Sequence, residues 1–225
     1  MRFSRSKSPL TRFYVLCDQV LTEVDSAKYL GITITRELQW ANQVATTANK
    51  GNSTLGFLRR NLKGCPHRLK ETAYISLVRS VLEYSAAIWD PYLGKDIDAL
   101  ERIQRRAARF VKSDYKTTSS VTAMLSELGW KDLASRRRDL RLALMYKVVH
   151  DHIAVPVDQL NLTKQDSRTR ASHGYTFRTQ RANTNEYLNS FVPRTIKDWN
   201  RLPAAAVESG TTESFKTQLA TVAWD

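Results

Sequence analysis

The chain has 225 residues, of which 42% are hydrophobic, so its length allows one large domain or two small ones with a core of ordinary size. Its 35 lysines and arginines outnumber its 22 aspartates and glutamates. The resulting net charge of +13 favours an anionic partner, with nucleic acid expected before an anionic membrane surface. Two cysteines exclude a disulfide framework and favour a reducing compartment, and no apolar run approaches the ~20 residues of a membrane helix. We therefore expect an intracellular protein, nuclear or cytoplasmic, with no secretory signal and no membrane contact.

Residues 1–36 are predicted to form strands. Two short stretches rich in β-forming residues flank a tight turn predicted at Asp18 and Gln19. Residues 29–35 then alternate large apolar residues with small or polar ones, which predicts a half-buried strand. Gly31 would lie inside this strand, where a missing side chain allows a close backbone approach or a bulge.

Four helical blocks are predicted to follow, because apolar residues recur at helical spacing. Their expected ranges are 37–62, 66–89, 95–111, and a fourth block of 121–128 and 133–151. The expected core positions of the first are Trp40, Val44, Ala48, Leu55 and Leu58. Those of the second form a main stripe of Leu69, Ala73, Leu77, Val81, Tyr84 and Ile88. Three flanking positions widen this stripe, namely Ile75, Val78 and Leu82. Those of the third are Ile97, Leu100, Ile103, Ala107 and Phe110.

The C-terminal part is predicted to be less regular. Residues 154–187 are polar and without a sustained period, which indicates an extended loop with an irregular strand pair near Phe177. A short helix is expected from Pro193 to Pro203, and a last one over 212–222. The sequence as a whole therefore predicts an α+β fold that is predominantly α-helical.

Three clusters of basic residues are candidate phosphate contacts. Guanidinium groups match phosphate geometry with two parallel hydrogen bonds. The clusters are Arg59, Arg60 and Lys63; Arg102, Arg105, Arg106 and Arg109; and Arg136, Arg137 and Arg138, followed by Arg141. In the second cluster the spacing of three and four places the arginines on one helix face, opposite the apolar stripe. The alternative is a solvated face, partly balanced by nearby acidic residues.

No catalytic residue and no metal site is predicted. Two-metal nucleotidyl transfer needs carboxylates that hold two ions ~3.5–4 Å apart. Asp96 and Asp98 form the tightest acidic pair, but they lie at a predicted helix start, where capping and the helix dipole favour acids. Cys65 and His67 have no second pair to complete a tetrahedral zinc site. Core packing rather than base stacking is expected of the tryptophans at helix ends, which are Trp40, Trp89, Trp130 and Trp199.

Short motifs follow one another along nearly the whole chain. They are SRSKSP at 4–9, VDSAKYLGI at 24–32, STLGFLRRNL at 53–62, LKETAY at 69–74, WDP at 89–91, QRRAARF at 104–110, LGW at 128–130, FVPRTI at 191–196 and WNRLP at 199–203. In order and spacing they resemble the C-terminal part of the reverse transcriptases of non-LTR retrotransposons (LINE-type, jockey-like). The resemblance implies a β-hairpin with a primer-grip-like strand over 1–36, a helical thumb-like domain over 37–153, and a loop-rich C-terminal extension with two short helices over 154–225.

The resemblance also implies which residues meet nucleic acid. Lys28, Tyr29, Leu30 and Gly31 would contact the primer strand, and Arg59, Arg60 and Lys63 would lie along the template–primer duplex. The partner would be an RNA–DNA hybrid or another duplex, with no small-molecule substrate. The family's palm, with its Mg²⁺-binding aspartates, would precede residue 1. The chain is therefore expected to be a fragment of an RNA-directed DNA polymerase, inactive alone and without a cofactor of its own.

Two other functions fit the same sequence. One is a helical protein-interaction scaffold whose arginines pair with an acidic partner. The other is a translated remnant of a transposable element without function. Binding to nucleic acid differs from the scaffold in its salt response, because each neutralised phosphate releases counterions.

Overall fold

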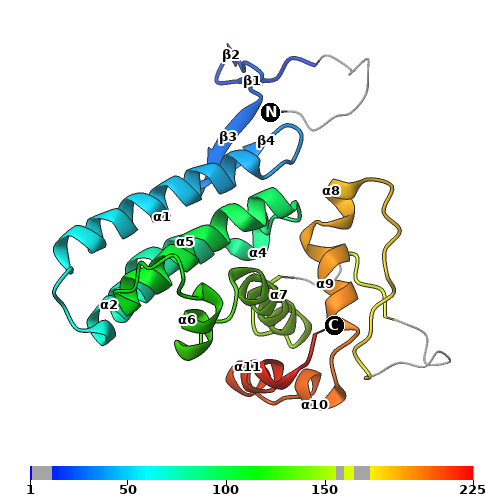
Figure 1. Ribbon diagram of the computed structural model, residues 1–225. Coiled ribbons are helices and arrows are strands. Elements are labelled where there is room, and N and C mark those ends of the chain that lie inside the picture. The colour runs from blue at the N-terminus through cyan, green and yellow to red at the C-terminus, as the bar shows by residue number, and fades with distance from the viewer. Residues whose placement is uncertain (2–11, 156–159, 165–172, 225) are drawn as a thin grey trace. The chain divides into compact units, whose positions relative to one another are not determined.

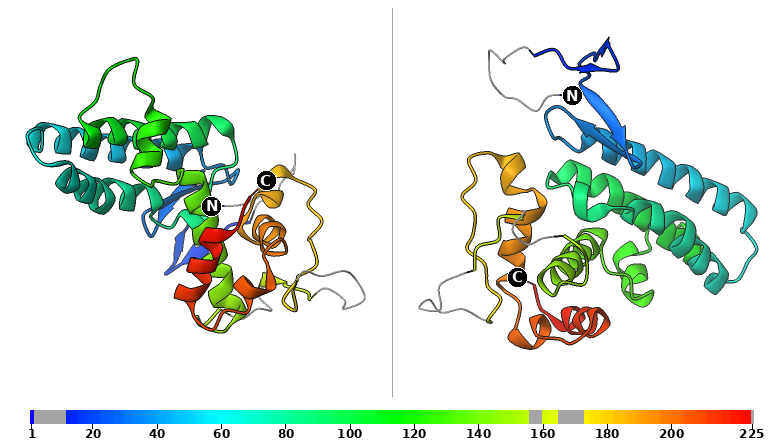
Figure 2. Two further views of the ribbon diagram at one scale, coloured as in Figure 1. Left: turned by 60° about the horizontal axis from the view of Figure 1, so that its bottom comes forward. Right: turned by 180° about the vertical axis from the view of Figure 1, so that it is seen from behind.

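The computed structural model describes residues 1, 12–155, 160–164 and 173–224, so the motif at 4–9 lies outside the described residues. The fold is α+β and mostly helical, with two small antiparallel sheets followed by helices (Figures 1 and 2), which confirms the expected fold class. The chain forms two compact units. Unit 1 comprises Met1–Ser85 and Pro91–Lys116, and unit 2 comprises Ala86–Asp90 and Thr117–Asp225. This division differs from the expected boundaries after residues 36 and 153.

Unit 1 opens with two antiparallel hairpins. Their strands are β1 (Val15–Leu16) with β2 (Gln19–Val20), and β3 (Ser26–Tyr29) with β4 (Ile32–Thr35). In the second hairpin Tyr29 pairs with Ile32, which leaves two residues for the turn. The prediction of one unbroken strand over 29–35 is therefore wrong.

Positive backbone angles at both turns explain this difference. Leu30 and Gly31 have φ of 46° and 83°, as a two-residue type I′ turn requires, so Gly31 is a turn residue. Cys17 and Asp18 have φ of 48° and 61° and form the first turn, one position earlier than expected. A glycine after an apolar residue fits a strand bulge and a hairpin turn equally well from sequence, and the pairing register decides between them.

The helices of unit 1 pack around one core. They are α1 (Ala41–Asn61), α2 (His67–Ala73), the π-helix η1 (Tyr74–Arg79), α3 (Ser80–Glu83) and α5 (Gly94–Lys112). Helix α1 runs beside α5 and also packs on η1 and α3 (Figures 1 and 2). Four of the five expected core positions of α1 are buried, and so are four of the five in α5.

The second predicted helix buries a row one position away from its expected main stripe, while two of the expected flanking positions, Val78 and Leu82, are buried as predicted. Leu69 and Leu77 are 49% and 50% exposed, whereas Tyr74, Val78 and Leu82 are fully buried. Apolar residues form a broad stripe on this segment, so its periodicity could not identify which of them lie innermost. The expected single helix over 66–89 is also interrupted, because the backbone turns away at Ser85, with φ of 51°.

Unit 2 is built around a long helix. Its helices are α4 (Ala86–Trp89), α6 (Val121–Glu127), α7 (Leu133–Val149), α8 (Asn185–Leu188), α9 (Phe191–Trp199), α10 (Ala204–Val207) and α11 (Thr212–Thr221). Helix α7 packs against α4, α9 and α11. The side chain of Ser120 caps α6, and Asp132 caps α7 through the Ser135 amide at 2.7 Å. Trp199, Phe215 and Tyr146 lie in the shared core.

One asparagine holds part of the predicted loop onto this core. The backbone amide of Phe177 donates to Asn200 Oδ1 at 3.0 Å, and Asn200 Nδ2 donates to the Phe177 carbonyl at 2.7 Å. The irregular strand pair expected here is a single bridge between Lys164 and Phe177. Over the part of the chain that the structure describes, no helix is long and apolar enough to cross a membrane.

Candidate nucleic-acid interface

The positive charge of the chain lies mainly in unit 1. Unit 1 holds 20 lysines and arginines against 10 aspartates and glutamates, whereas unit 2 holds 15 against 12. The net charges are therefore +10 and +3. Since a local excess of one sign attracts counterions over several ångströms, unit 1 is the part of the chain most suited to an anionic polymer.

A hollow beside the second hairpin contains three of the four residues expected at the primer strand. Its volume is about 550 Å³. It is lined by Lys28, Leu30, Gly31, Gln43, Thr46, Thr47, Lys50, Ser80, Val81 and Tyr84. Two ammonium groups and several hydroxyl groups thus surround a space without a carboxylate in its lining. Tyr29 is 65% exposed and lies outside this lining.

Hydrogen bonds to α1 and α3 hold the hairpin in place. The backbone amide of Thr33 donates to Gln43 Oε1 at 2.8 Å, and Gln43 Nε2 donates to the Thr47 hydroxyl at 3.2 Å. The Tyr84 hydroxyl donates to the Leu30 carbonyl at 3.1 Å. A Cβ on Gly31 would lie 3.5 Å from the Tyr84 ring and in a strained backbone region. Glycine is therefore favoured here by the positive φ of the turn, since a Cβ 3.5 Å from the ring would make an ordinary contact.

A second basic region, which we call the α1–α5 basic face, comprises Arg59 and Arg60 of α1 and Lys63 just after it, with Arg106 and Arg109 of α5. Two contacts tie its helices and the segment after α5 together. Arg106 Nη1 donates to Asn52 Oδ1 at 3.1 Å, and the Arg59 guanidinium lies over the Tyr115 ring, 5.2 Å from its centroid. A hollow of about 560 Å³ opens here, lined by Gly56, Arg59, Arg60, Lys63 and Tyr115.

The expected common face of the α5 arginines is confirmed. Arg102, Arg105 and Arg106 are exposed and Arg109 is half-buried, while the opposite side of α5 is in the core. Arg109 Nη1 also donates to the Lys116 carbonyl at 2.8 Å. This bond places Arg109 next to the residue that follows Tyr115, so the first and second predicted clusters meet at one surface.

The third predicted cluster does not form a surface. Arg137 is 1% exposed and its Nε donates to Asp90 Oδ1 at 2.8 Å. Arg141 is 2% exposed and bonds to Asp90 and Asp198. The expectation that Arg137 contacts nucleic acid is therefore wrong, because its guanidinium is used inside unit 2. Arg136 and Arg138 are half-buried.

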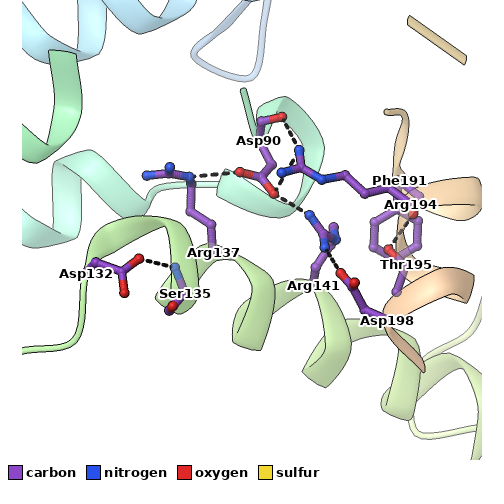
Figure 3. A network of polar contacts seen from close by, with 9 residues as sticks. All are labelled: Asp90, Asp132, Ser135, Arg137, Arg141, Phe191, Arg194, Thr195 and Asp198. Atoms are coloured by element: carbon purple, nitrogen blue, oxygen red, sulfur yellow. Dashed lines mark hydrogen bonds and ion pairs between the residues drawn. The ribbon is translucent and has the colours of Figure 1, made fainter. Parts of the chain in front are cut away.

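Asp90 is the centre of this buried network (Figure 3). Arg194 of α9 donates to the Asp90 backbone carbonyl at 3.0 Å and lies 3.2 Å from its carboxylate, so arginines from α7 and α9 converge on one acid. Burial lowers the pKa of Arg194, and Asp90 opposes that change. Sequence reasoning missed Asp90, Arg194 and Asp198 as partners, since no local pattern relates residues this far apart.

Other candidate sites have structural roles. Trp89, Trp130 and Trp199 are buried, which confirms the expected packing role for these three, and Trp40 is half-buried. Asp96 lies in the first turn of α5. Within the described residues, no three His, Cys, Asp or Glu side chains gather as a metal site would require.

Comparison of the chain with protein-family models, with curated proteins and with solved structures finds no match. Charge and geometry are therefore the main grounds for a functional conclusion. In the described part of unit 1, charge and geometry indicate two candidate surfaces. One is the hollow beside the second hairpin, which we call the hairpin hollow, and the other is the α1–α5 basic face.

Proposed function

We propose that unit 1 binds a nucleic-acid duplex, with an RNA–DNA hybrid as the expected form, through its backbone phosphates. The observation that carries this proposal is the net charge of +10 on unit 1, with basic side chains gathered at the hairpin hollow and the α1–α5 basic face. Arginine and lysine at such a surface neutralise phosphates and release counterions, which is the main sequence-independent source of affinity.

The length of α1 suits contact with several phosphates. Lys50 lines the hairpin hollow and Arg60 lies ten positions later. Ten helical residues span about 15 Å, a distance over which one strand of a duplex presents about four phosphates. The two basic regions of unit 1 are thus separated along the helix by a distance that one strand can cover.

The resemblance to retrotransposon reverse transcriptases supports the same proposal. In that family the matching segments are the primer grip and the thumb, which hold the template–primer duplex. Lys28, Leu30 and Gly31 would then contact the primer strand at the hairpin hollow. The α1–α5 basic face, with Arg102 and Arg105, would lie along the duplex.

Fluorescence anisotropy of the full chain with a labelled RNA–DNA hybrid hairpin tests the proposal. We expect micromolar or tighter binding at low salt. If about six phosphates are neutralised, affinity should fall roughly a thousandfold between 50 and 200 mM salt. No binding at low salt by a protein whose circular dichroism is that of a folded helical protein would contradict the proposal.

A matched pair of triple variants locates the interface. Arg59→Gln, Arg60→Gln and Lys63→Gln together remove three charges from the C-terminal end of α1 and the residues just after it. We expect them to weaken binding by about tenfold or more and to reduce the salt slope by about three. The control removes three exposed charges of unit 2 by Arg178→Gln, Arg201→Gln and Lys216→Gln, and should weaken binding much less. Equal losses in the two variants would exclude a specific surface on α1.

A protein-interaction scaffold is the second candidate, and the exposed Leu69 and Leu77 favour it. Large apolar side chains at an exposed helix face are typical of protein contacts. An interface with an apolar core loses little affinity with added salt, in contrast to phosphate binding. The salt titration therefore separates the two functions.

A further inference from the structure

A hollow of about 370 Å³ in unit 2 lies between α7 and α9, beside the end of α8. Four cationic side chains line it, namely Arg138, Arg141, Arg194 and Lys197, and Asp198 is the acidic residue of the lining. The volume is within the range of small-ligand sites. The excess of cations among the lining residues indicates the charge of a ligand that would fit.

The network behind this hollow also carries an excess of positive charge. Arg137, Arg141 and Arg194 surround Asp90 and Asp198, so three guanidinium groups meet two carboxylates. Arg137 and Arg141 are almost fully buried. A buried charge without a full counter-charge is unfavourable, so an added anion at the open side would stabilise the network.

The arginines that line the hollow do not have all their hydrogen-bond donors satisfied by the protein. Arg141 Nε and Arg138 Nε are buried and have no hydrogen-bond partner among the described residues. Most buried polar groups in proteins have a partner, so two arginine donors without one at a single hollow are unusual. Both belong to guanidinium groups, whose planar donors fit the oxygens of an oxyanion.

Trp224 orients one of these arginines. The guanidinium of Arg138 stacks on the Trp224 ring, with 4.1 Å from Cζ to the ring centroid. Stacking covers the flat face of the guanidinium and leaves its N–H edge able to donate in the plane. Arg138 is thereby held as a preformed donor on the wall of the hollow.

We propose that this hollow in unit 2 binds a small oxyanion of the phosphate class. A tetrahedral dianion offers negative charge to this mainly cationic lining and oxygens that accept from its guanidinium groups, and the volume leaves room for a small group attached to it. All lining residues belong to unit 2, so this site is separate from the duplex-binding surface proposed for unit 1.

Isothermal titration calorimetry of the full chain with inorganic phosphate tests this proposal, with sodium chloride at the same ionic strength as the blank. We expect one phosphate per chain. Arg138→Gln and Lys197→Gln each remove a lining charge without touching the Asp90 network, and each should weaken phosphate binding about tenfold or more. Lys216→Gln, an exposed change on α11, should leave it unaltered.

Two results would overturn the proposal. One is no heat from phosphate beyond the chloride blank. The other is that Arg138→Gln and Lys197→Gln weaken binding of a duplex without terminal phosphates but leave the response to free phosphate unchanged. The cluster would then contact the nucleic-acid backbone. If Arg138→Gln and Lys197→Gln abolish phosphate binding but leave duplex binding intact, the result supports a site for a free oxyanion. The proposal for unit 1 is then unaffected.

Discussion

Asp90 accepts hydrogen bonds from Arg137 and Arg141 of α7 and from Arg194 of α9 (Figure 3). Its neighbours in sequence gave no sign of this role, since a Trp-Asp-Pro segment at a helix end fits a simple stop signal. Arg137 is buried against this carboxylate, whereas its neighbour Arg136 is half-buried. At the scale of one residue, function and stability thus depend on distant partners.

Asp90→Asn should destabilise unit 2 strongly. The amide removes the charge that three arginines share, and breaking a buried ion network in this way typically costs about 3–5 kcal/mol. Urea denaturation followed by circular dichroism measures the change. Asp25→Asn is the matched control, because Asp25 and Arg36 form an exposed pair 3.8 Å apart. It should have little effect. Similar losses in both variants would show that burial of the network contributes nothing.

His173 should make unit 2 less stable in mild acid. Its Nδ1 accepts from the Tyr175 amide at 3.2 Å and its Nε2 donates to the Trp199 carbonyl at 3.1 Å, which requires the neutral ring. Burial lowers the pKa of His173, although the Trp199 carbonyl and Glu208 oppose the change.

The unfolded ring therefore binds a proton first, and stability is present above about pH 6.5 and falls as the pH drops below it. Thermal denaturation between pH 7.5 and 5.5 should show a decrease in Tm that is smaller in His173→Gln. An equal decrease in both proteins would assign the effect to other groups.

At the scale of elements, the difference in polarity between the two faces of a helix decides how well its buried face can be predicted. Helix α5 has arginines on one face and apolar residues on the other, so its inner face was predicted correctly. The segment from α2 to α3 has a broad apolar stripe, and its expected main row lies one position away from the row that is buried. Leu82, one of the expected flanking positions, packs closely against Gly51 of α1.

Gly51→Val should destabilise unit 1. A Cβ at this position would lie 2.8 Å from Leu82 Cδ2, and a branched side chain leaves little room for that leucine to move. Overpacking of this kind costs about 1–3 kcal/mol. Gly56→Ala is the control on the same helix. Its new Cβ would meet only Arg60 Nη1 at 3.6 Å, so better helix propensity should stabilise the chain by up to about 1 kcal/mol. Chemical denaturation measures both, and a neutral Gly51→Val would contradict tight packing here.

At the scale of the whole molecule, charge divides unevenly between the two units. Unit 1 carries +10 and unit 2 carries +3. Like charges close together repel one another, and salt screens that repulsion. The surface expected to attract a duplex is thus also the part of the chain most destabilised by its own charge.

Added salt should therefore protect unit 1 more than unit 2. Hydrogen exchange measured by mass spectrometry at low ionic strength and at about 0.3 M, where the screening length falls well below 10 Å, should show slower exchange in α1 and α5. Exchange in α7 and α9 should change less and serves as the internal control. An equal change in the two units would mean that charge repulsion is not concentrated in unit 1.

The sequence by itself determined the α+β, mostly helical class and the exposed arginine face of α5. It also placed the basic residues at the end of α1. These features depend on local periodicity and on local charge, which can be read from neighbouring residues. It also marked residues 28–31 as a special segment, although not as a turn.

Only the tertiary structure decided which basic residues face outward and which are buried. Asp90 lies 47 positions from Arg137 and 104 from Arg194, and their convergence follows from the packing of α4, α7 and α9. A guanidinium buried in the core needs a counter-charge beside it, because an uncompensated charge there costs too much, and Asp90 supplies that charge to Arg137. The same run of three arginines therefore contains a core residue, Arg137, and a wall of the proposed oxyanion site, Arg138.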